Sequence, residues 1–195
     1  DGIDVYDPLN DEVKLVTGFH FQASGNSLTA VLPLNVLGLS AGQTIGLSAF
    51  QEGASDGWAV DWIESDNLTL GGLATSMVAV TDGQDLGDSS GDLRAVGLQV
   101  LGGNLHFSMT VEGVAAPATE QTPEGKSNRY YYHWLLDTDN NPATGRSNSE
   151  YENSPTGVQK PVGAERVVQI GWRNGLPDGI DVYDPLNDEV KLIAG

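Results

Sequence analysis

The sequence predicts an all-β fold, a sandwich of two antiparallel sheets. Three observations predict it. Short runs rich in β-branched and aromatic residues recur along the chain, 25 glycines and 9 prolines supply turns between them, and helical periodicity is nearly absent. A series of about ten short strands separated by turn signals is typical of a β-sandwich.

The first 81 residues contain six expected strands, one helical turn and a short apolar run. The expected strands are residues 3–5, 13–16, 19–21, 28–32, 45–50 and 58–63. The strand at 28–32 ends at Pro33, because proline cannot donate to a central β-ladder. Residues 34–39 are expected to form the helical turn at one end of the sandwich, and the apolar run lies at 77–80.

An acidic, glycine-rich segment at 82–92 precedes a second group of strands, and we place a domain boundary there. The expected strands of this group are residues 93–100, 104–111, 129–136 and 165–171. Gly102 and Gly103 suit a tight hairpin between the first two, because such turns need positive φ. The aromatic run at 129–136 is the strongest candidate for a central strand.

Residues 1–15 and 178–192 are identical, which is the clearest sign of how the chain is organised. After the identical run the copies diverge, because residues 16–18 read VTG and residues 193–195 read IAG. This divergence argues against a simple cloning duplication. The spacing of 177 residues (178 − 1) far exceeds the roughly 20–50 residues of solenoid repeats, so the repeating unit is a whole domain in tandem.

The charge balance excludes several classes of partner. Nine Lys and Arg stand against 27 Asp and Glu, for a net charge of −18. Nucleic acid is disfavoured because no basic patch can neutralise phosphates, and an anionic membrane surface is disfavoured for the same reason. The chain has no cysteine and no apolar run of membrane-spanning length. Such acidity suggests divalent cations as partners, with a solvated acidic surface as the alternative.

The loop that follows the strongest expected strand reads DTDNN, with oxygen ligands at its first, third and fifth positions. Calcium takes about 6–8 oxygen ligands, and a turning Asp/Asn loop supplies several from one segment. We therefore expect Asp137, Asp139 and Asn141 to bind calcium. Further ligands must come from elsewhere, with Glu150 and Glu165 as the acidic candidates. The alternative is an Asx-turn without a metal.

No pattern in the sequence supports catalysis, and we expect that the protein is not an enzyme. Residues 38–42 match the G-x-S-x-G pattern of a nucleophile elbow. That pattern has meaning between a strand and a helix, whereas Ser40 follows a helical turn and precedes a strand. The histidines lie in separate expected strands and form no close pair.

Two further features bear on glycans. The triplet that begins at Asn67 is a possible N-glycosylation acceptor in a secreted chain. The tryptophans, with the tyrosines at 130–132, are candidates for a platform that stacks on sugars. Even spacing of Trp58 and Trp62 along one strand face favours a core position over a platform.

Three short motifs carry a resemblance to a known group of domains. They are the D-x-D-N-N-P-x-T-G loop at 137–145, the G-A-E segment at 163–165 and the L-P-L-x-x-L-G segment at 32–38. Read from residue 92 and continued through the repeat, the chain resembles extracellular modules related to family 9 carbohydrate-binding and DOMON-like domains. The resemblance implies a jelly-roll-like sandwich, often calcium-bound and repeated in secreted or surface proteins of bacteria and archaea. It also implies calcium ligation by Asp137, Asp139, Asn141 and Glu165.

In this order the domain is permuted across the repeat boundary. Residues 1–81 would be the late half of one sandwich repeat, 82–92 a linker, and 93–195 the early half of the next repeat. Either the two halves close on each other within one chain, or a neighbouring repeat completes each half. The second arrangement is strand donation, in which main-chain hydrogen bonds complete an open sheet.

These observations predict a structural repeat unit of an extracellular filament or surface layer, supported by calcium, with copies of itself as partners. Assembly would proceed head to tail, by tandem repetition or by strand donation. The alternative is a carbohydrate-binding module of a secreted multidomain protein, with glycans as partners. The residues expected on the assembly strands are Ile3, Val5, Tyr6, Val13, Leu15, Ile180, Val182, Tyr183, Val190 and Leu192.

Overall fold

The structure is a computed structural model that describes residues 2–7, 12–17, 21–53, 61–71, 78–85, 87, 89–115, 129–147, 162–173, 176–177, 181–184 and 189–192. Its strands are β1 (Gly2–Asp7), β2 (Glu12–Thr17), β3 (Phe21–Ser24), β4 (Ser27–Pro33), β5 (Thr44–Gly53), β6 (Asp61–Thr69), β7 (Val78–Thr81), β8 (Leu93–Leu101), β9 (Asn104–Val111), β10 (Arg129–Asp137), β11 (Arg146–Ser147), β12 (Gly163–Ala164), β13 (Arg166–Arg173), β14 (Leu176–Pro177), β15 (Asp181–Asp184) and β16 (Glu189–Leu192). A 3-10 helix, η1 (Leu34–Val36), lies between β4 and β5. No helix of the described part is long and apolar enough to cross a membrane.

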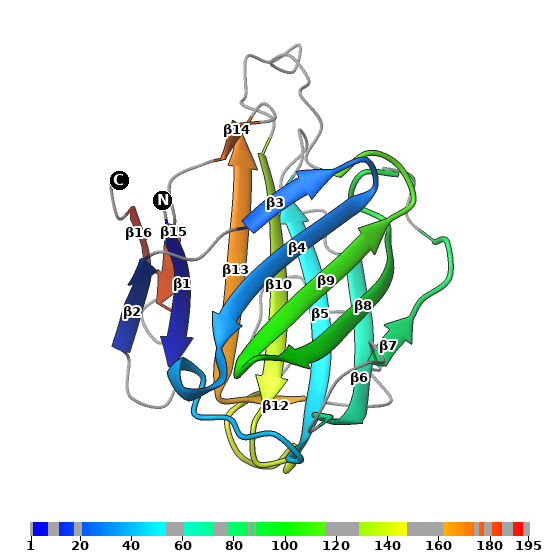
Figure 1. Ribbon diagram of the computed structural model, residues 1–195. Helices are drawn as coiled ribbons and strands as arrows, with labels where there is room; N and C mark the ends of the chain where they lie inside the picture. The colour runs from blue at the N-terminus through cyan, green and yellow to red at the C-terminus, as the bar shows by residue number, and fades with distance from the viewer. Residues whose placement is uncertain are drawn as a thin grey trace.

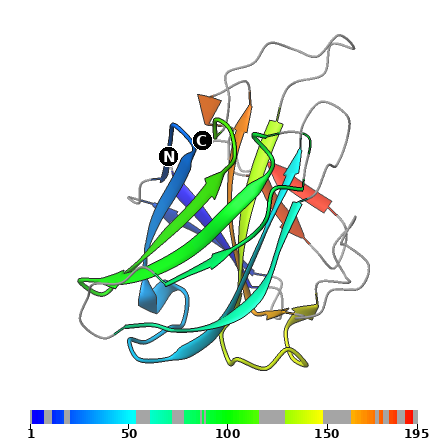
Figure 2. The same ribbon diagram turned by 90° about the vertical axis from the view of Figure 1, so that its right-hand side faces the viewer.

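The strands form two large sheets that pack face to face (Figures 1 and 2). The larger sheet has the order β2-β1-β13-β10-β5-β6, with β14 also paired to β13, and the smaller has the order β3-β4-β9-β8-β7. Neighbouring strands in both sheets run antiparallel. The prediction of an all-β, two-sheet antiparallel sandwich is confirmed.

The main core lies between the two sheets and follows from the alternation of side chains along each strand. Positions along β9 alternate between half-buried and buried over its whole length. Because successive side chains point to opposite faces, every second residue of such a strand reaches the core. Phe107 from β9 and Tyr132 and Trp134 from β10 are at most 1% exposed there.

The two halves of the chain close on each other within one sandwich. In the smaller sheet, β4 from the first half pairs with β9 from the second. In the larger sheet, β5 from the first half pairs with β10 from the second. The acidic segment at 82–92 connects β7 to β8, which are themselves paired. Of the two expected arrangements, closure within the chain is therefore the one that the structure has, and the assignment of the halves to successive repeats stays a prediction.

The two copies of the repeated sequence form the same hairpin. In the first copy β1 pairs with β2 so that Asp4 faces Leu15 and Tyr6 faces Val13. In the second copy β15 pairs with β16 so that Asp181 faces Leu192 and Tyr183 faces Val190, which is the same register shifted by 177 residues. The copies differ in surroundings, because β1 also pairs with β13, whereas β15 and β16 pair only with each other among the described strands (Figure 1).

Several elements differ in length from the expectation. The strand expected at 58–63 corresponds to β6, which runs on to Thr69 because it pairs along most of β5, with a bulge between Leu47 and Ala49. Residues 58–60 lie outside the described residues. The helical turn expected at 34–39 is the short η1, and Leu37 after it is buried. The length of a strand depends on the strands that pair with it, and a local apolar pattern carries no information about these partners.

Candidate metal centre

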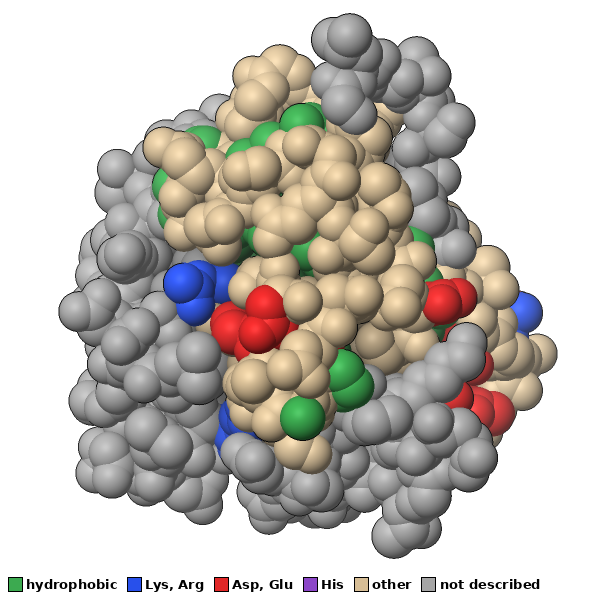
Figure 3. Space-filling model, turned by 90° about the horizontal axis from the view of Figure 1, so that it is seen from below, with side chains coloured by type: hydrophobic (Ala, Val, Ile, Leu, Met, Phe, Trp, Pro, Cys, Tyr) green, Lys and Arg blue, Asp and Glu red, His purple; other side chains and the backbone are tan. Residues whose placement is uncertain are grey.

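The predicted calcium loop lies at the end of β10. Asp137 is the last residue of this strand and is 3% exposed. The backbone of the loop turns at Asn140, which has a positive φ of 56°, a conformation that asparagine tolerates better than most residues. β10 runs toward the lower end of the molecule in Figure 1, and Figure 3 shows acidic side chains gathered near the middle of that end beside basic ones.

Hydrogen bonds within the loop fix the positions of both aspartates. The backbone N–H of Asn141 donates to Oδ1 of Asp137 at 2.8 Å and to Oδ1 of Asp139 at 3.0 Å. The Thr144 hydroxyl donates to Oδ2 of Asp139 at 2.9 Å. The Asx-turn that was the alternative to a metal site is thus present. It holds the two carboxylates in place, so the turn and a metal site are compatible.

Glu165 reaches this loop from the segment between β12 and β13. Its backbone N–H donates to the carbonyl of Leu136 at 3.0 Å. Its Oε2 accepts hydrogen bonds from the backbone N–H and the hydroxyl of Thr138, at 2.7 and 3.2 Å. Its Oε1 has no hydrogen-bond partner among the described residues, although Glu165 is only 6% exposed. A buried carboxylate oxygen without a partner is costly, and a cation would satisfy it.

Asp137, Asp139 and Glu165 form a group that we call the loop cluster. One carboxylate oxygen from each of the three lies within 4.8 Å of the others. Burial raises the pKa of both Asp137 and Glu165, and the neighbouring carboxylates raise these pKa values further. Three carboxylates that converge in this way favour a bound cation, because it removes both their repulsion and their desolvation cost.

The loop cluster contains three of the four residues expected to bind calcium. Asn141, the fourth, lies in the same loop, where its Oδ1 accepts a hydrogen bond from the backbone N–H of Ala143 at 3.2 Å. Glu150, the other acidic candidate, lies outside the described residues. Oxygen donors of this kind suit a hard cation such as calcium, which would need further oxygens to reach its usual coordination number.

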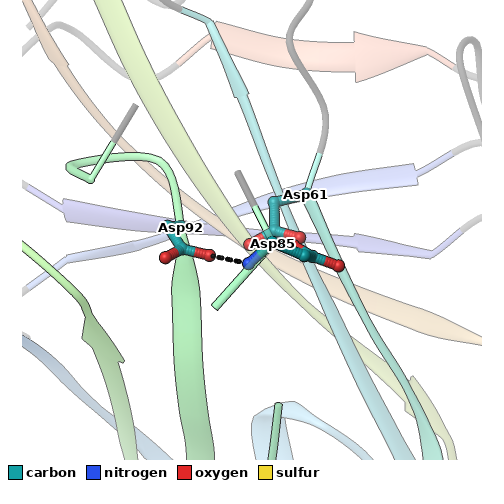
Figure 4. Close-up of side chains that lie close together, drawn as sticks. All are labelled: Asp61, Asp85 and Asp92. Atoms are coloured by element: carbon teal, nitrogen blue, oxygen red, sulfur yellow. Dashed lines mark hydrogen bonds between the residues drawn. The ribbon is translucent and has the colours of Figure 1, made fainter. Parts of the chain in front are cut away.

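A second group of carboxylates, which the sequence did not indicate, joins β6 to β8 (Figure 4). Asp61 and Asp92 are almost completely buried, and Asp85 is exposed beside them. Asp61 accepts hydrogen bonds from the backbone N–H groups of Trp62 and Leu93, and Asp92 accepts one from the backbone N–H of Asp85. The bond from Leu93 connects the smaller sheet to the larger one, whereas the other two are local in the chain.

Asp61 should make stability depend on pH. Burial raises its pKa from 3.8 to about 7, helped by Asp85 and Asp82 and opposed by the hydrogen bonds from Leu93 and Trp62. The contribution of Asp61 to the free energy of unfolding is therefore complete below about pH 3.8, and it is lost as the pH rises toward 7 and the carboxyl group ionises in the folded state.

We expect Asp61→Asn to flatten the dependence of the unfolding free energy on pH between these values. At pH 8 the charged carboxylate costs at most about 4 kcal/mol, at 1.36 kcal/mol per pKa unit, and the asparagine avoids this cost. Urea unfolding from pH 4 to 8 measures the difference. Asp66→Asn is the control, because Asp66 is an exposed residue on the same strand. Equal slopes in both variants would contradict the prediction.

The remaining predicted residues have varied positions. Ile3, Val5, Tyr6, Val13 and Leu15 lie on β1 and β2, and Val182, Tyr183, Val190 and Leu192 lie on β15 and β16. Ile180 lies outside the described residues. Asn67 is exposed on β6, so its side chain is open to modification.

The described tryptophans all lie on the larger sheet and pack against hydrophobic clusters. Trp134 and Trp172 belong to the main core. Trp62, on the other face of the larger sheet, stacks on Phe50 with ring centroids 4.5 Å apart, and Phe50 stacks in turn on His133. Trp58 lies outside the described residues. A flat sugar platform built from the three described tryptophans would therefore require the sandwich to rearrange.

Comparisons with protein-family models, with curated proteins and with solved structures found no match.

Proposed function

We propose that this chain is a structural repeat unit of an extracellular filament or surface layer, joined head to tail to further copies of itself and supported by calcium. The observation that carries the proposal is the second hairpin. β15–β16 repeats the register of β1–β2 pair by pair, and it begins after the sandwich has already been closed by its own first copy. In the proposed array, the second hairpin would be the first element of a following sandwich.

The connection between successive sandwiches would be short. β14 ends at Pro177 and β15 begins at Asp181, so residues 178–180 are the whole connection. Three extended residues span at most about 10 Å. Neighbouring sandwiches would therefore abut, which favours a stiff array over beads on a flexible string.

The identity of the two copies favours a covalent tandem array over exchange between separate chains. If the second hairpin of one chain replaced the first hairpin of another, it would make the same interactions as the hairpin that it displaced. Association would then lack a favourable term to offset the lost translational and rotational freedom, which costs about 4–15 kcal/mol. A tandem array avoids this cost, because its sandwiches are already linked.

Electron microscopy of the native material, with and without a calcium chelator, tests the proposal. We expect filaments or sheets with an axial repeat of one sandwich, and fraying when calcium is removed. Isolated particles of one sandwich that do not change on chelation would contradict it.

Calcium binding by the loop cluster is the part of the proposal that can be tested on the chain itself. Asp137, Asp139 and Glu165 would hold the ion, and Oε1 of Glu165, which has no hydrogen-bond partner in the part of the chain that the structure describes, supports this choice. A single site stabilises the fold by RT ln(1 + [Ca²⁺]/Kd), about 2.7 kcal/mol when calcium is at 100 times Kd. Extracellular sites often have Kd values of about 10⁻⁴–10⁻³ M, so calcium at several millimolar is appropriate.

We expect Asp139→Asn to remove most of this stabilisation in urea unfolding experiments. The asparagine keeps an oxygen for the N–H of Asn141, so the loop retains a hydrogen bond while it loses a charge. Asp66→Asn removes the same charge at an exposed position outside the cluster, and it should keep the full calcium effect. An equal calcium effect in both variants would place the ion elsewhere.

A further inference from the structure

The outer edge of β13 is shared by two separate segments. One edge of β13 pairs with β10, and the other takes β1 and β14. β14 pairs at the end of β13, where Pro177 faces Trp172. β1 pairs further along, where Asp4 faces Gln169. Both segments run antiparallel to β13, so they run in the same direction along one edge.

The second copy of the hairpin follows β14 directly and can reach the place that β1 occupies. The counterpart of Asp4 in the second copy is Asp181 (4 + 177). Asp181 is four residues after Pro177, whereas Gln169 is only three residues before Trp172, the residue that faces Pro177. One extra residue among 178–180 would therefore bring the second copy into the register of β1. A β-bulge accommodates one extra residue in an antiparallel pair.

The chain holds both copies close to this edge by connections of equal length. Residues 18–20 join the first hairpin to β3, and residues 178–180 join the second hairpin to β14. The two hairpins have the same sequence over the paired residues, so they would make the same contacts with β13. An exchange within one chain also costs no translational freedom. The state with the first hairpin on β13 and the state with the second hairpin there should therefore have similar free energies. The bulge that the second hairpin needs is the main difference between them.

We propose that the outer edge of β13 is a single acceptor site that either copy of the hairpin can fill, and that the second copy of the same chain fills it when the first is displaced. In a tandem array each hairpin would then lie between two acceptor edges, that of the preceding sandwich and that of its own. The inference extends the proposed function, but it concerns one chain and does not require assembly.

A competition between cysteines in the full chain tests the proposal. The protein has no cysteine, so introduced thiols are the only ones present. Gln169→Cys supplies one thiol on β13, and Asp4→Cys and Asp181→Cys supply its two competitors. Directly opposed residues of antiparallel strands have Cα atoms about 4.5–5.5 Å apart, which suits a disulfide. The triple variant is equilibrated at low concentration in a glutathione redox buffer.

Tryptic peptide mapping then separates the products. The peptides that carry positions 4 and 181 differ in length, because trypsin cuts after Lys14 in one and after Arg173 and Lys191 in the other. We expect the 169–181 disulfide to account for at least about a tenth of the disulfides that the thiol at position 169 forms in monomers. A tenfold ratio between the two products corresponds to a free-energy difference of only about 1.4 kcal/mol. Val5→Pro, which removes a donor from β1, should make the 169–181 disulfide the major product, and Val182→Pro should suppress it.

Each outcome decides the proposal. The proposal is overturned if the 169–181 disulfide makes up less than a tenth of the disulfides of the thiol at position 169, both in the triple variant and in the triple variant that also carries Val5→Pro. If circular dichroism shows that the proline variant does not fold, the result for the triple variant decides alone. A 169–181 disulfide that links two chains, seen as dimers and larger species on a non-reducing gel, would also overturn occupancy within one chain. That result would favour exchange between chains over a covalent tandem array. Electron microscopy of the native material tests the filament or layer independently, so the two proposals fail separately.

Discussion

Replacing Trp134 with alanine is expected to lower the free energy of unfolding by about 3–5 kcal/mol, the range for deleting a large buried aromatic side chain. Trp134 is completely buried in the middle of β10 and lies against Phe107 of the opposite sheet, with ring centroids 5.4 Å apart. Its indole N–H also donates to the carbonyl of Ser108 at 3.1 Å. The alanine would leave a cavity between the sheets and remove this hydrogen bond. Urea unfolding monitored by circular dichroism measures the loss.

Two further variants separate the causes. Trp134→Phe keeps most of the ring but removes the indole N–H, and a net hydrogen bond contributes about 0.5–1.5 kcal/mol. Trp62→Ala removes a tryptophan that is only partly buried on the other face of the larger sheet. We expect both losses to be clearly smaller than that of Trp134→Ala. Equal losses for Trp62→Ala and Trp134→Ala would contradict a core centred between the two sheets.

The sequence predicts the parts of the candidate site that are local in the chain. An apolar strand followed by alternating oxygen ligands is a local pattern, and it predicted the site at the end of β10, where Asp137 ends the strand and Asp139 lies in the loop that follows. Glu165 is 28 positions from Asp137 (165 − 137), so spacing alone could not select it over Glu150. A short G-A-E motif and a resemblance pointed to it.

The second carboxylate group shows what a single sequence does not contain. Asp61 lies on β6 of the larger sheet and Asp92 directly precedes β8 of the smaller one, and no local spacing relates them. Only the packing of β6 near β8 brings them together. The segment at 82–92 resembles a linker for a similar reason. An acidic, glycine-rich composition indicates exposure to solvent, but it does not reveal that the strands on either side pair with each other.

The two copies of the repeat form the same hairpin, because identical sequence favours identical local pairing. What the sequence could not supply was the difference in their surroundings. Among the described residues, the first copy pairs with β13 and the second does not, although both hairpins have the same internal register. Tertiary context and the order of connections decide such differences, and these lie outside any local pattern.

Gly163→Ala is expected to destabilise the fold and to weaken calcium binding together. A Cβ at Gly163 would overlap the carbonyl oxygen of Thr144, and it would lie 3.0 Å from both the Asn141 oxygen and the Cα of Pro142. All three are backbone atoms of the predicted calcium loop, so the loop must move away from β12. Overpacking of this kind costs about 1–3 kcal/mol and occasionally more. Gly71→Ala is the control, because nothing lies within 4 Å of a Cβ there.

The informative result is whether Gly163→Ala loses stability and calcium binding together. Glu165 follows Gly163 by two positions and contacts the loop through Thr138, so a shift between the loop and β12 separates Glu165 from the two aspartates. Urea unfolding of Gly163→Ala with saturating calcium and with chelator gives both quantities from one set of samples. If the variant loses stability in chelator but keeps the full increment from calcium, the loop and Glu165 do not act as one site. If the increment shrinks along with the stability, the contact between β12 and the loop is what assembles the three carboxylates.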